Sequence, residues 1–181
     1  DARLEELTAL NWSSQPLVSL YLGGGSPSLW EPTELGQLID GVTDRLGFQS
    51  GAEITIEANP EEIDVGKVSA WKSFGINRVS LGVQSMREEG LQALGRQHSP
   101  QQVYEAVQLI REAGISRLNI DLIHGLRGEG SADALFDLEA ALALDVGHLS
   151  LYQLTVEDKT DFGYRAKKGE QLIEPEERLI L

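Results

Sequence analysis

A glycine-rich segment, Gly23-Gly24-Gly25-Ser26-Pro27, is the part of the sequence best suited to contact a ligand. Consecutive glycines let a backbone approach a ligand closely and leave its N–H and C=O groups unhindered. A tight turn without a ligand would use the same residue types. No Gly-Lys-Ser/Thr follows, as a phosphate loop would need, and Pro27 interrupts the spacing of a dinucleotide fingerprint. We therefore interpret the segment as a ligand-contacting turn of another kind.

Polar residues also follow the other apolar runs of the sequence, one after each run. They are Glu57, Gln84, Asp121 and Thr155, after residues 54–56, 79–83, 118–120 and 149–154. Taken alone, Glu57 could instead cap the following turn or pair with a basic neighbour, and Gln84 and Asp121 raise the same question. Polar groups at the ends of consecutive strands are much less expected by chance. The set predicts one shared cleft.

Five short apolar runs are the elements that would position these groups, and the first of them spans residues 17–22. About thirty residues, mostly of helical pattern, separate neighbouring runs, which is the length of a βα unit. The runs are rich in Val, Ile and Leu, as expected of parallel strands covered by helices. In parallel α/β sheets the ligand lies beyond the carboxyl ends of the strands. The pattern predicts five parallel strands with helices on their outer face.

Helices are predicted from apolar periodicity and from the residues that start and stop them. Asp64 is the expected N-cap of a helix that stops at Gly75, and Ser99-Pro100 starts a helix that ends before Gly114. The full set of predicted helices is 2–10, 32–46, 65–74, 87–94, 100–113, 131–144 and one beginning at 175. The predicted buried stripes are Leu35, Leu38, Ile39 and Val42; Val103, Val107, Ile110 and Ala113; and Leu135, Leu138, Ala141 and Leu142.

Composition limits the classes of function that fit. A chain of 181 residues suits a single domain over residues 1–181, and no apolar stretch is long enough to span a bilayer, so we expect a cytoplasmic protein. Fifteen basic against 29 acidic residues give a net charge of −14, which argues against nucleic acid as a partner. The sequence has no cysteine and therefore no thiolate ligand or thiol nucleophile.

Other residues capable of chemistry give weaker indications. Arg96 has a surface role by default, although its guanidinium would suit a ligand carboxylate if it reached the cleft. His98, His124 and His148 are too scattered for a zinc motif, which favours structural roles. No lysine ends a strand, which argues against a Schiff-base aldolase. The sequence predicts no metal-ligating and no catalytic side chain.

Six segments in a fixed order resemble the radical S-adenosylmethionine (SAM) proteins of the coproporphyrinogen oxidase family. They are GGGSPS, EITIEANP, RVSLGVQS, LGRQH, LNIDLIHGL and HLSLYQLTVEDKT. Each motif is weak alone, but the ordered series is specific and covers nearly the whole chain. The resemblance implies a partial (β/α)6 barrel, a TIM-like fold whose mouth holds SAM against a [4Fe-4S] cluster.

The resemblance also implies roles for individual residues. Gly24, Gly25 and Ser26 would lie along the methionine moiety of SAM. The other implied SAM contacts are Glu57, Gln84, Arg96, Asp121 and Thr155, the last near the nucleoside. Residues 148–154, HLSLYQL, are more similar to the heme-chaperone branch than to the oxidase proper, so we favour that branch, with heme or a porphyrinogen as partner.

The sequence departs from the family in three respects. Ser26 stands where threonine is usual, and Arg127 stands where proline is common. The cysteine motif that binds the cluster is missing, so we expect the first strand with its cluster loop before Asp1 and a C-terminal domain after Leu181. A chain without cysteine cannot assemble the cluster.

Several functions stay open at this stage. The first is the core of a radical SAM heme chaperone, and the second is that of a coproporphyrinogen III dehydrogenase. The chain could also be a non-catalytic α/β binding module, and a nucleotide-binding oxidoreductase is a more distant alternative.

Overall fold

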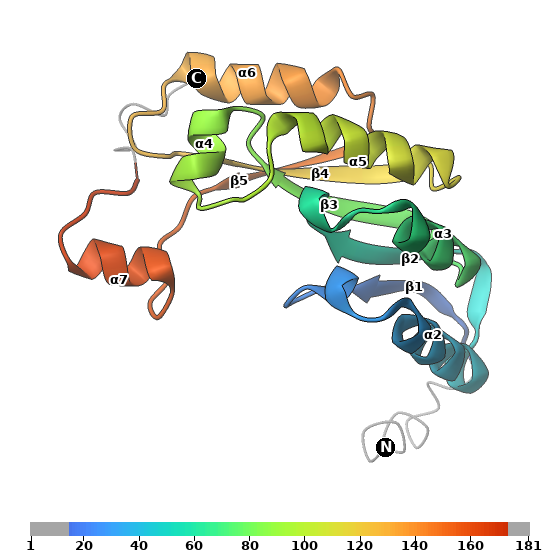
Figure 1. The fold of residues 1–181 in the computed structure, drawn as a ribbon. Coiled ribbons are helices and arrows are strands. Elements are labelled where there is room, and N and C mark those ends of the chain that lie inside the picture. Colours follow the sequence, from blue (N-terminus) through green and yellow to red (C-terminus); the bar gives the residue numbers. More distant parts are fainter. Residues whose placement is uncertain (1–14, 174–181) are drawn as a thin grey trace.

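A computed structural model describes residues 15–173 and shows five parallel strands that form one curled sheet (Figure 1). The strands pair in sequence order, β1-β2-β3-β4-β5. Their bounds are β1 Leu17–Leu22, β2 Phe48–Ala58, β3 Arg78–Gln84, β4 Arg117–His124 and β5 His148–Gln153. The order and the parallel pairing confirm the sequence prediction of five βα-type strands.

Helices connect the strands and cover the convex face of the sheet, which gives the molecule the shape of an arch (Figure 1). The α-helices are α2 Pro32–Leu46, α3 Val65–Ser73, α4 Glu88–Ala93, α5 Pro100–Glu112, α6 Ser131–Leu142 and α7 Asp161–Lys167. Two short 3-10 helices, η2 Pro27–Leu29 and η3 Pro60–Glu62, follow β1 and β2. The fold is the predicted α/β half-barrel.

The start and stop residues of the helices act as predicted. The Asp64 side chain accepts a hydrogen bond from the backbone N–H of Lys67 at 2.8 Å, and Ser99 caps α5 in the same way through Gln102. Gly75 and Gly114 follow the helices with φ of +89° and +80°, a conformation that glycine adopts without a steric cost. The observed first and last residues of α3 and α5 agree with the predicted ones to within two residues.

Strict alternation separates the two faces of the central strands. In β3, Val79, Leu81 and Val83 are fully buried against the helices, while Arg78 and Ser80 point to the concave face. Strands β2 and β4 follow the same rule, and their apolar residues join one core that includes Trp71 of α3. The sequence indicated strands rich in apolar residues. In the structure the apolar side chains of β3 lie on the convex face, and its polar side chains lie on the concave face.

The predicted apolar stripes are only partly buried. Leu35 and Ile39 of α2 are buried, but Leu38 is 41% exposed. In α6 the stripe was only partly right: Ala141 is buried as predicted, but Leu135 and Leu142 are 46% and 58% exposed, and Asp137 is buried instead. Helix α6 covers the edge of the sheet, where a polar contact with the loop after β3 replaces apolar packing.

Some element bounds differ from the sequence prediction. Strand β2 begins at Phe48 rather than at residue 54, because its first part pairs with β1 across a register shift. Strand β4 continues to His124, so Asp121 lies inside a strand instead of at its end. Helix α7, capped by Thr160, was not predicted. The helices expected at 2–10 and from 175 lie outside the described residues.

Candidate functional site

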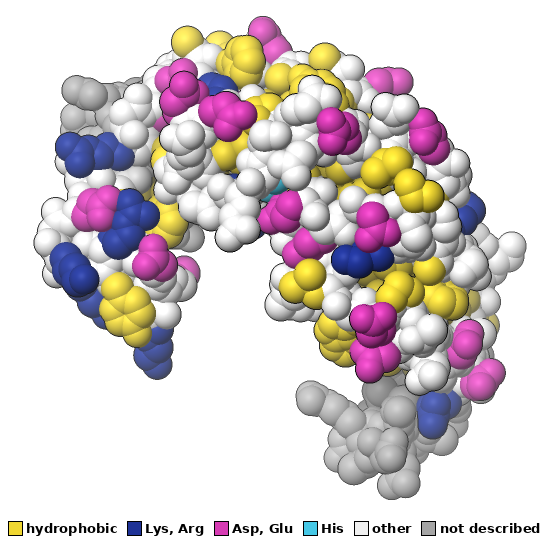
Figure 2. All heavy atoms as spheres, in the orientation of Figure 1, with side chains coloured by type: hydrophobic (Ala, Val, Ile, Leu, Met, Phe, Trp, Pro, Cys, Tyr) yellow, Lys and Arg dark blue, Asp and Glu magenta, His cyan; other side chains and the backbone are white. Residues whose placement is uncertain are grey.

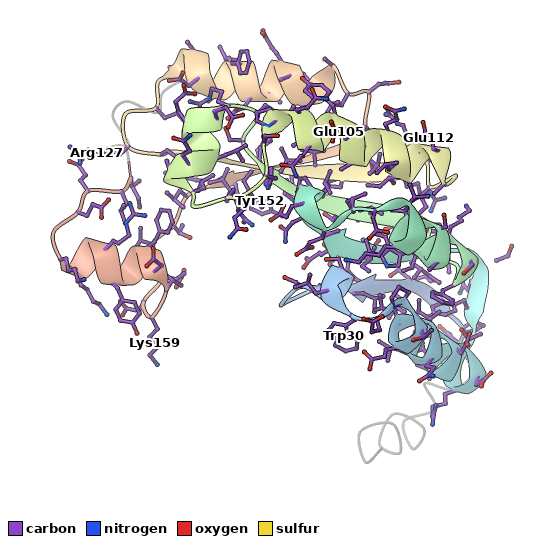
Figure 3. All side chains as sticks on the ribbon, in the orientation of Figure 1. Trp30, Glu105, Glu112, Arg127, Tyr152 and Lys159 are labelled. Atoms are coloured by element: carbon purple, nitrogen blue, oxygen red, sulfur yellow. The ribbon has the colours of Figure 1, made fainter. Side chains whose placement is uncertain are left out.

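A cleft of about 300 Å³ opens at the carboxyl-terminal side of the sheet, on the concave face. All five strands, or the loops directly after them, contribute to its wall. The lining residues are Tyr21, Gly25, Ser26, Pro27, Ser28, Glu57, Ala58, Asn59, Ser80, Gly82, Gln84, Asp121 and Tyr152. The space-filling view shows the hollow of the arch between α7 and the β1 end (Figure 2), and Tyr152 points toward that hollow (Figure 3).

Glu57 connects β2 to the glycine-rich loop after β1. Its Oε2 accepts a hydrogen bond from the backbone N–H of Gly24 at 2.9 Å, and its Oε1 accepts one from the Tyr21 hydroxyl at 2.9 Å. Each carboxylate oxygen has a second lone pair for a ligand. A side chain at Gly23 would collide with this pair, since its Cβ would lie 2.7 Å from Tyr21 Cε1 and 2.8 Å from Glu57 Oε1. A larger residue at this position would have to displace the Tyr21–Glu57 pair.

Tyr21 is a donor held in its protonated form. Burial raises the pKa of its hydroxyl, a hydrogen bond with Ser80 lowers it, and the neighbouring Glu57 carboxylate raises it again, so that the net pKa lies above 10.0. A neutral phenol next to Glu57 can donate its proton to the carboxylate at neutral pH. The pair consequently fixes the direction of the Glu57 carboxyl group.

Glu62 forms a second connection between the loops. Its carboxylate accepts hydrogen bonds from the Ser28 hydroxyl, from the backbone N–H of Asn59 at 2.9 Å and from Asn59 Nδ2 at 3.0 Å. Burial raises the pKa of Glu62, but the hydrogen bonds from Ser28 and Asn59 outweigh it and leave the pKa below 4.5. Arg96 then donates to Asn59 Oδ1 at 3.3 Å. The glycine-rich loop, η3 and the loop after α4 are thus joined through Asn59 and Glu62.

Gln84 occupies a strained position at the end of β3. Its φ of +71° is uncommon for a residue with a side chain. The two residues that follow it are held by buried Asp137 of α6, which accepts from the Ser85 hydroxyl at 2.8 Å and from the Met86 N–H at 2.9 Å. Such strain persists only where the surroundings fix the backbone. Asp137 supplies that support from the convex side.

A buried ion cluster extends this support. Arg87 contacts Asp137 at 3.3 Å and Glu129 at 2.5 Å, and both carboxylates are almost fully buried. Glu129 in turn accepts from the backbone N–H groups of Gly125 and Leu126. The guanidinium offsets part of the cost of burying the two carboxylates, although Arg87 Nε is buried without a hydrogen-bond partner among the described residues. The cluster fixes the loop after β3 against the loop after β4.

Asp121 belongs to a polar network on the concave face. Its carboxylate accepts from the Ser80 hydroxyl at 3.1 Å and from Asn119 Nδ2 at 2.8 Å. Ser80 and Asn119 are buried and bonded to each other at 2.7 Å, whereas Asp121 reaches the cleft. These hydrogen bonds hold the Asp121 carboxylate in a fixed position at the wall of the cleft.

The predicted site residues fall into three groups. Five of them line the cleft, namely Gly25, Ser26, Glu57, Gln84 and Asp121. Gly24 donates to Glu57 from the adjoining loop, and Arg96 contacts the cleft-lining Asn59 without lining the cleft. Thr155 is exposed, two residues after β5, and does not line it. Of the four polar residues predicted to share one cleft, Glu57, Gln84 and Asp121 line it and Thr155 does not.

Sequence reasoning missed several cleft residues. Tyr21, Ser80 and Tyr152 lie inside strands, where their side chains alternate toward the concave face. Asn59 belongs to the segment EITIEANP but was not singled out as a site residue. A strict count of alternation along β1, β3 and β5 would have indicated the three strand residues.

The charge of the cleft favours a cationic or hydroxyl-rich ligand. Two carboxylates, those of Glu57 and Asp121, line it, and no lysine or arginine does so within the described part of the chain. The aromatic ring of Tyr152 and the open backbone of the glycine-rich loop complete the wall. The arrangement can bind an ammonium or sulfonium group together with sugar hydroxyls.

The histidines do not form a metal site. His98 is buried, with Nδ1 3.0 Å from Glu61 Oε2 and Nε2 2.9 Å from the carbonyl of Val83, a structural role. Within residues 15–173 there is no group of three or more His, Cys, Asp or Glu side chains that could hold a metal ion. No helix in the same range is long and apolar enough to cross a membrane.

Residues 1–140 match the radical SAM superfamily, and the chain belongs to that superfamily. The match includes the glycine-rich loop and the first four strands. Members of this superfamily use SAM together with a [4Fe-4S] cluster. The half-barrel and the cleft at its carboxyl end agree with this membership.

Curated relatives in this superfamily are heme chaperones. The chain is 44% identical over 147 residues to the heme chaperone HemW of Escherichia coli. The aligned region covers 81% of this chain and 39% of that protein. It is 33% identical over 171 residues to HemW of Lactococcus lactis, covering 93% of this chain and 45% of that protein. The chain therefore spans less than half the length of these relatives.

Solved structures share the fold. Coproporphyrinogen III oxidase (HemN) of Escherichia coli superimposes with a TM-score of 0.77 at 24% identity, covering 98% of this chain and 42% of that one. The archaeal Elp3 of Methanocaldococcus infernus gives 0.76 at 21% identity, covering 98% and 46%. These likenesses confirm the partial barrel of the radical SAM type.

Proposed function

We propose that residues 1–181 form a single SAM-binding core domain of a radical SAM protein of the heme-chaperone branch. The observation that carries the proposal is the cleft in which Glu57, Asp121 and the glycine-rich loop converge. The similarity to HemW supports the branch. Predicted SAM contacts that line or adjoin the cleft are Gly24, Gly25, Ser26, Glu57, Gln84 and Asp121, with Arg96 acting through Asn59.

The donors present suit SAM chemically. SAM carries an ammonium and a sulfonium cation, and the two carboxylates of the cleft supply the opposite charge. Glu57 keeps acceptor capacity beyond its bonds to Gly24 and Tyr21. The Tyr152 ring offers a face for stacking with the adenine. Thr155 lies outside the cleft and supports the proposal least.

The chain does not supply ligands for the iron–sulfur cluster. Three thiolates hold a radical SAM cluster, and none of the 181 residues is a cysteine. No step of the radical reaction is therefore assigned to these residues. Their proposed part is to bind and orient SAM, while the electron transfer belongs to the cluster. We expect this chain alone to show no SAM cleavage.

Heme is the proposed cargo, and we propose a cytoplasmic location. This part rests on the sequence similarity to heme chaperones, and residues 148–154 are the stretch of this chain that favours that branch over the oxidase. The acidic balance of the chain makes nucleic acid an unexpected partner.

SAM titration of the 181-residue chain by isothermal calorimetry tests the proposal. Glu57→Ala should raise the Kd about ten- to a hundredfold, because a hydrogen bond to a charged group contributes roughly 1.5–3 kcal/mol. Glu105→Ala is a control with the same loss of charge, since Glu105 lies on the outward side of α5 (Figure 3). It should leave the Kd unchanged.

S-adenosylhomocysteine sharpens the test, because it lacks the sulfonium charge. It should bind more weakly than SAM if the carboxylates recognise that charge. An unchanged Kd for Glu57→Ala, or equal effects of Glu57→Ala and Glu105→Ala, would contradict the assignment of the cleft.

A further inference from the structure

His98, in the loop between α4 and α5, has a fully buried side chain whose ring contacts two other segments. Its Nε2 lies 2.9 Å from the backbone carbonyl oxygen of Val83 in β3, and its Nδ1 lies 3.0 Å from Oε2 of Glu61 in η3. A carbonyl oxygen can only accept a hydrogen bond, so Nε2 carries a proton and donates it. His98 therefore links the end of β3 to η3 and to the loop that carries Arg96.

The carbonyl of Val83 also closes a tight turn around Gln84. The Ser85 N–H donates to the same oxygen at 2.9 Å, which makes residues 83–85 a γ-turn with Gln84 at its centre. The φ of Gln84 is +71°, and a γ-turn with a positive central φ is the rare and strained form. The pairing of β3 with β4 shifts register between Leu81 and Gln84, so the strand ladder is irregular at this turn.

Two buried polar side chains hold the turn, one at each end. Asp137 holds the residues after it, through the Ser85 hydroxyl and the Met86 N–H. His98 holds the residue before it, through the carbonyl of Val83. Neither Asp137 nor His98 lines the cleft. Strained backbone persists only where its surroundings fix it, and these contacts provide that support.

The turn determines where the Gln84 side chain lies. Gln84 lines the cleft, and a Cβ added at Gly82 would lie 3.0 Å from Gln84 Nε2 and 3.0 Å from Asn59 Oδ1. The Gln84 amide and the Asn59 amide therefore approach the same glycine in the cleft wall. Relaxation of Gln84 to a negative φ would turn its side chain away from this position.

We propose that His98 is a positioning residue for the ligand, because it holds the strained γ-turn that presents Gln84 to the cleft. The inference rests on the proposed SAM site and adds to it a residue that does not touch the ligand. The apparent affinity for a ligand falls with the fraction of the protein that is in the binding-competent conformation. Loss of the hydrogen bond from His98 to Val83 should therefore weaken SAM binding without removing a ligand contact.

Two substitutions of His98 separate this role from simple packing. The side-chain amide of glutamine reaches the position of ring Nε2, and that of asparagine reaches the position of Nδ1. His98→Gln keeps a donor for Val83 and loses the contact with Glu61, whereas His98→Asn does the reverse. Isothermal calorimetry of the 181-residue chain should show SAM binding about tenfold weaker in His98→Asn and close to the parent Kd in His98→Gln.

A control and a second measurement complete the test. Ile110→Val is the control for lost stability, because Ile110 is fully buried in α5 and does not line the cleft. It should lower the urea midpoint of unfolding and leave the Kd for SAM unchanged. In the unsubstituted chain, the Nε2–H resonance of His98 in proton–nitrogen correlation spectra should shift when SAM binds.

The outcomes separate the two proposals. If the parent chain binds no SAM, the proposed function and the role of His98 are both overturned. If it binds SAM, the role of His98 alone is overturned when His98→Asn keeps the parent Kd, or when His98→Gln or Ile110→Val binds as weakly as His98→Asn. If His98→Asn does not fold, the ring resonance decides, and an unchanged Nε2–H signal at saturating SAM overturns the role.

Discussion

The convex and concave faces of the sheet are built from the same strands but use opposite chemistry. On the convex face Ile56, Val79 and Ile120 are fully buried under the helices. On the concave face Glu57, Ser80 and Asp121 alternate with them and form a polar network. In an ordinary (β/α) barrel the interior is filled by branched apolar side chains. The difference indicates that stability comes from the convex face and ligand binding from the concave face.

A helix on the convex side also supports the cleft. Asp137 of α6 reaches from the convex side to the loop after β3 and holds the backbone next to Gln84. Burying a carboxylate between a helix and a sheet carries a desolvation cost that an apolar side chain would not have. Its position next to a strained cleft residue accounts for it, since its hydrogen bonds hold Ser85 and Met86, the two residues that follow Gln84.

Substitutions at two adjacent residues of β4, one on each face, should show the largest difference between an effect on stability and an effect on SAM binding. Ile120→Ala removes a fully buried side chain and should lower the free energy of unfolding by about 2–5 kcal/mol. Asp121→Asn should lower it by about 1 kcal/mol and should mainly weaken SAM binding. Urea denaturation followed by circular dichroism measures the first effect, and calorimetry the second. Equal losses of stability in the two variants would break the comparison.

A change at the glycine-rich loop should affect the cleft and leave the core intact. Gly23→Ala would place a Cβ 2.7 Å from the Tyr21 ring and 2.8 Å from Glu57, and should weaken SAM binding about tenfold, or about 1.4 kcal/mol. Gly147→Ala is the control, because nothing lies within 4 Å of its added Cβ. Matched affinities of the two variants would show that the Tyr21–Glu57 pair does not shape the ligand site.

The smallest expected effect is a pH dependence at Glu62. Its pKa lies below 4.5 in the folded protein, so its contribution to stability is present above pH 4.5 and is lost as the pH falls through the folded pKa. Glu62→Gln should therefore cost about 1 kcal/mol at pH 7, and this difference should shrink toward pH 3. Exposed Glu34→Gln serves as a control. A constant difference from pH 7 to pH 3 would show that the carboxylate charge is not involved.

The sequence predicted the strands and most helices because local rules decide them. The bounds of α2 were given by Pro32 and the apolar period, and those of α5 by Ser99 and Gly114. The exposed positions Leu135 and Leu142 could not be predicted, because they depend on how little of α6 the sheet edge covers. Helix α7 begins at a Thr160 cap that has no apolar stripe behind it.

The candidate site was predicted in part for a similar reason. Glu57 and Gln84 end strands, and the topology of parallel strands brings such residues together. The partners that orient them are distant in sequence: Asp137 is 52 residues from Ser85, and Glu62 is 34 residues from Ser28. Contacts of this kind have no local pattern and required the three-dimensional arrangement.

Hydrogen–deuterium exchange of the 181-residue chain with and without saturating SAM tests the division of the two faces most directly. The account predicts slower exchange in residues 23–28, 57–62 and 84–86, which form or support the cleft. Exchange in α3 and in the middle of α5, on the convex face, should not change. Protection confined to those helices, or no protection in any of the three cleft segments at saturation, would contradict the assignment of the concave face as the SAM site.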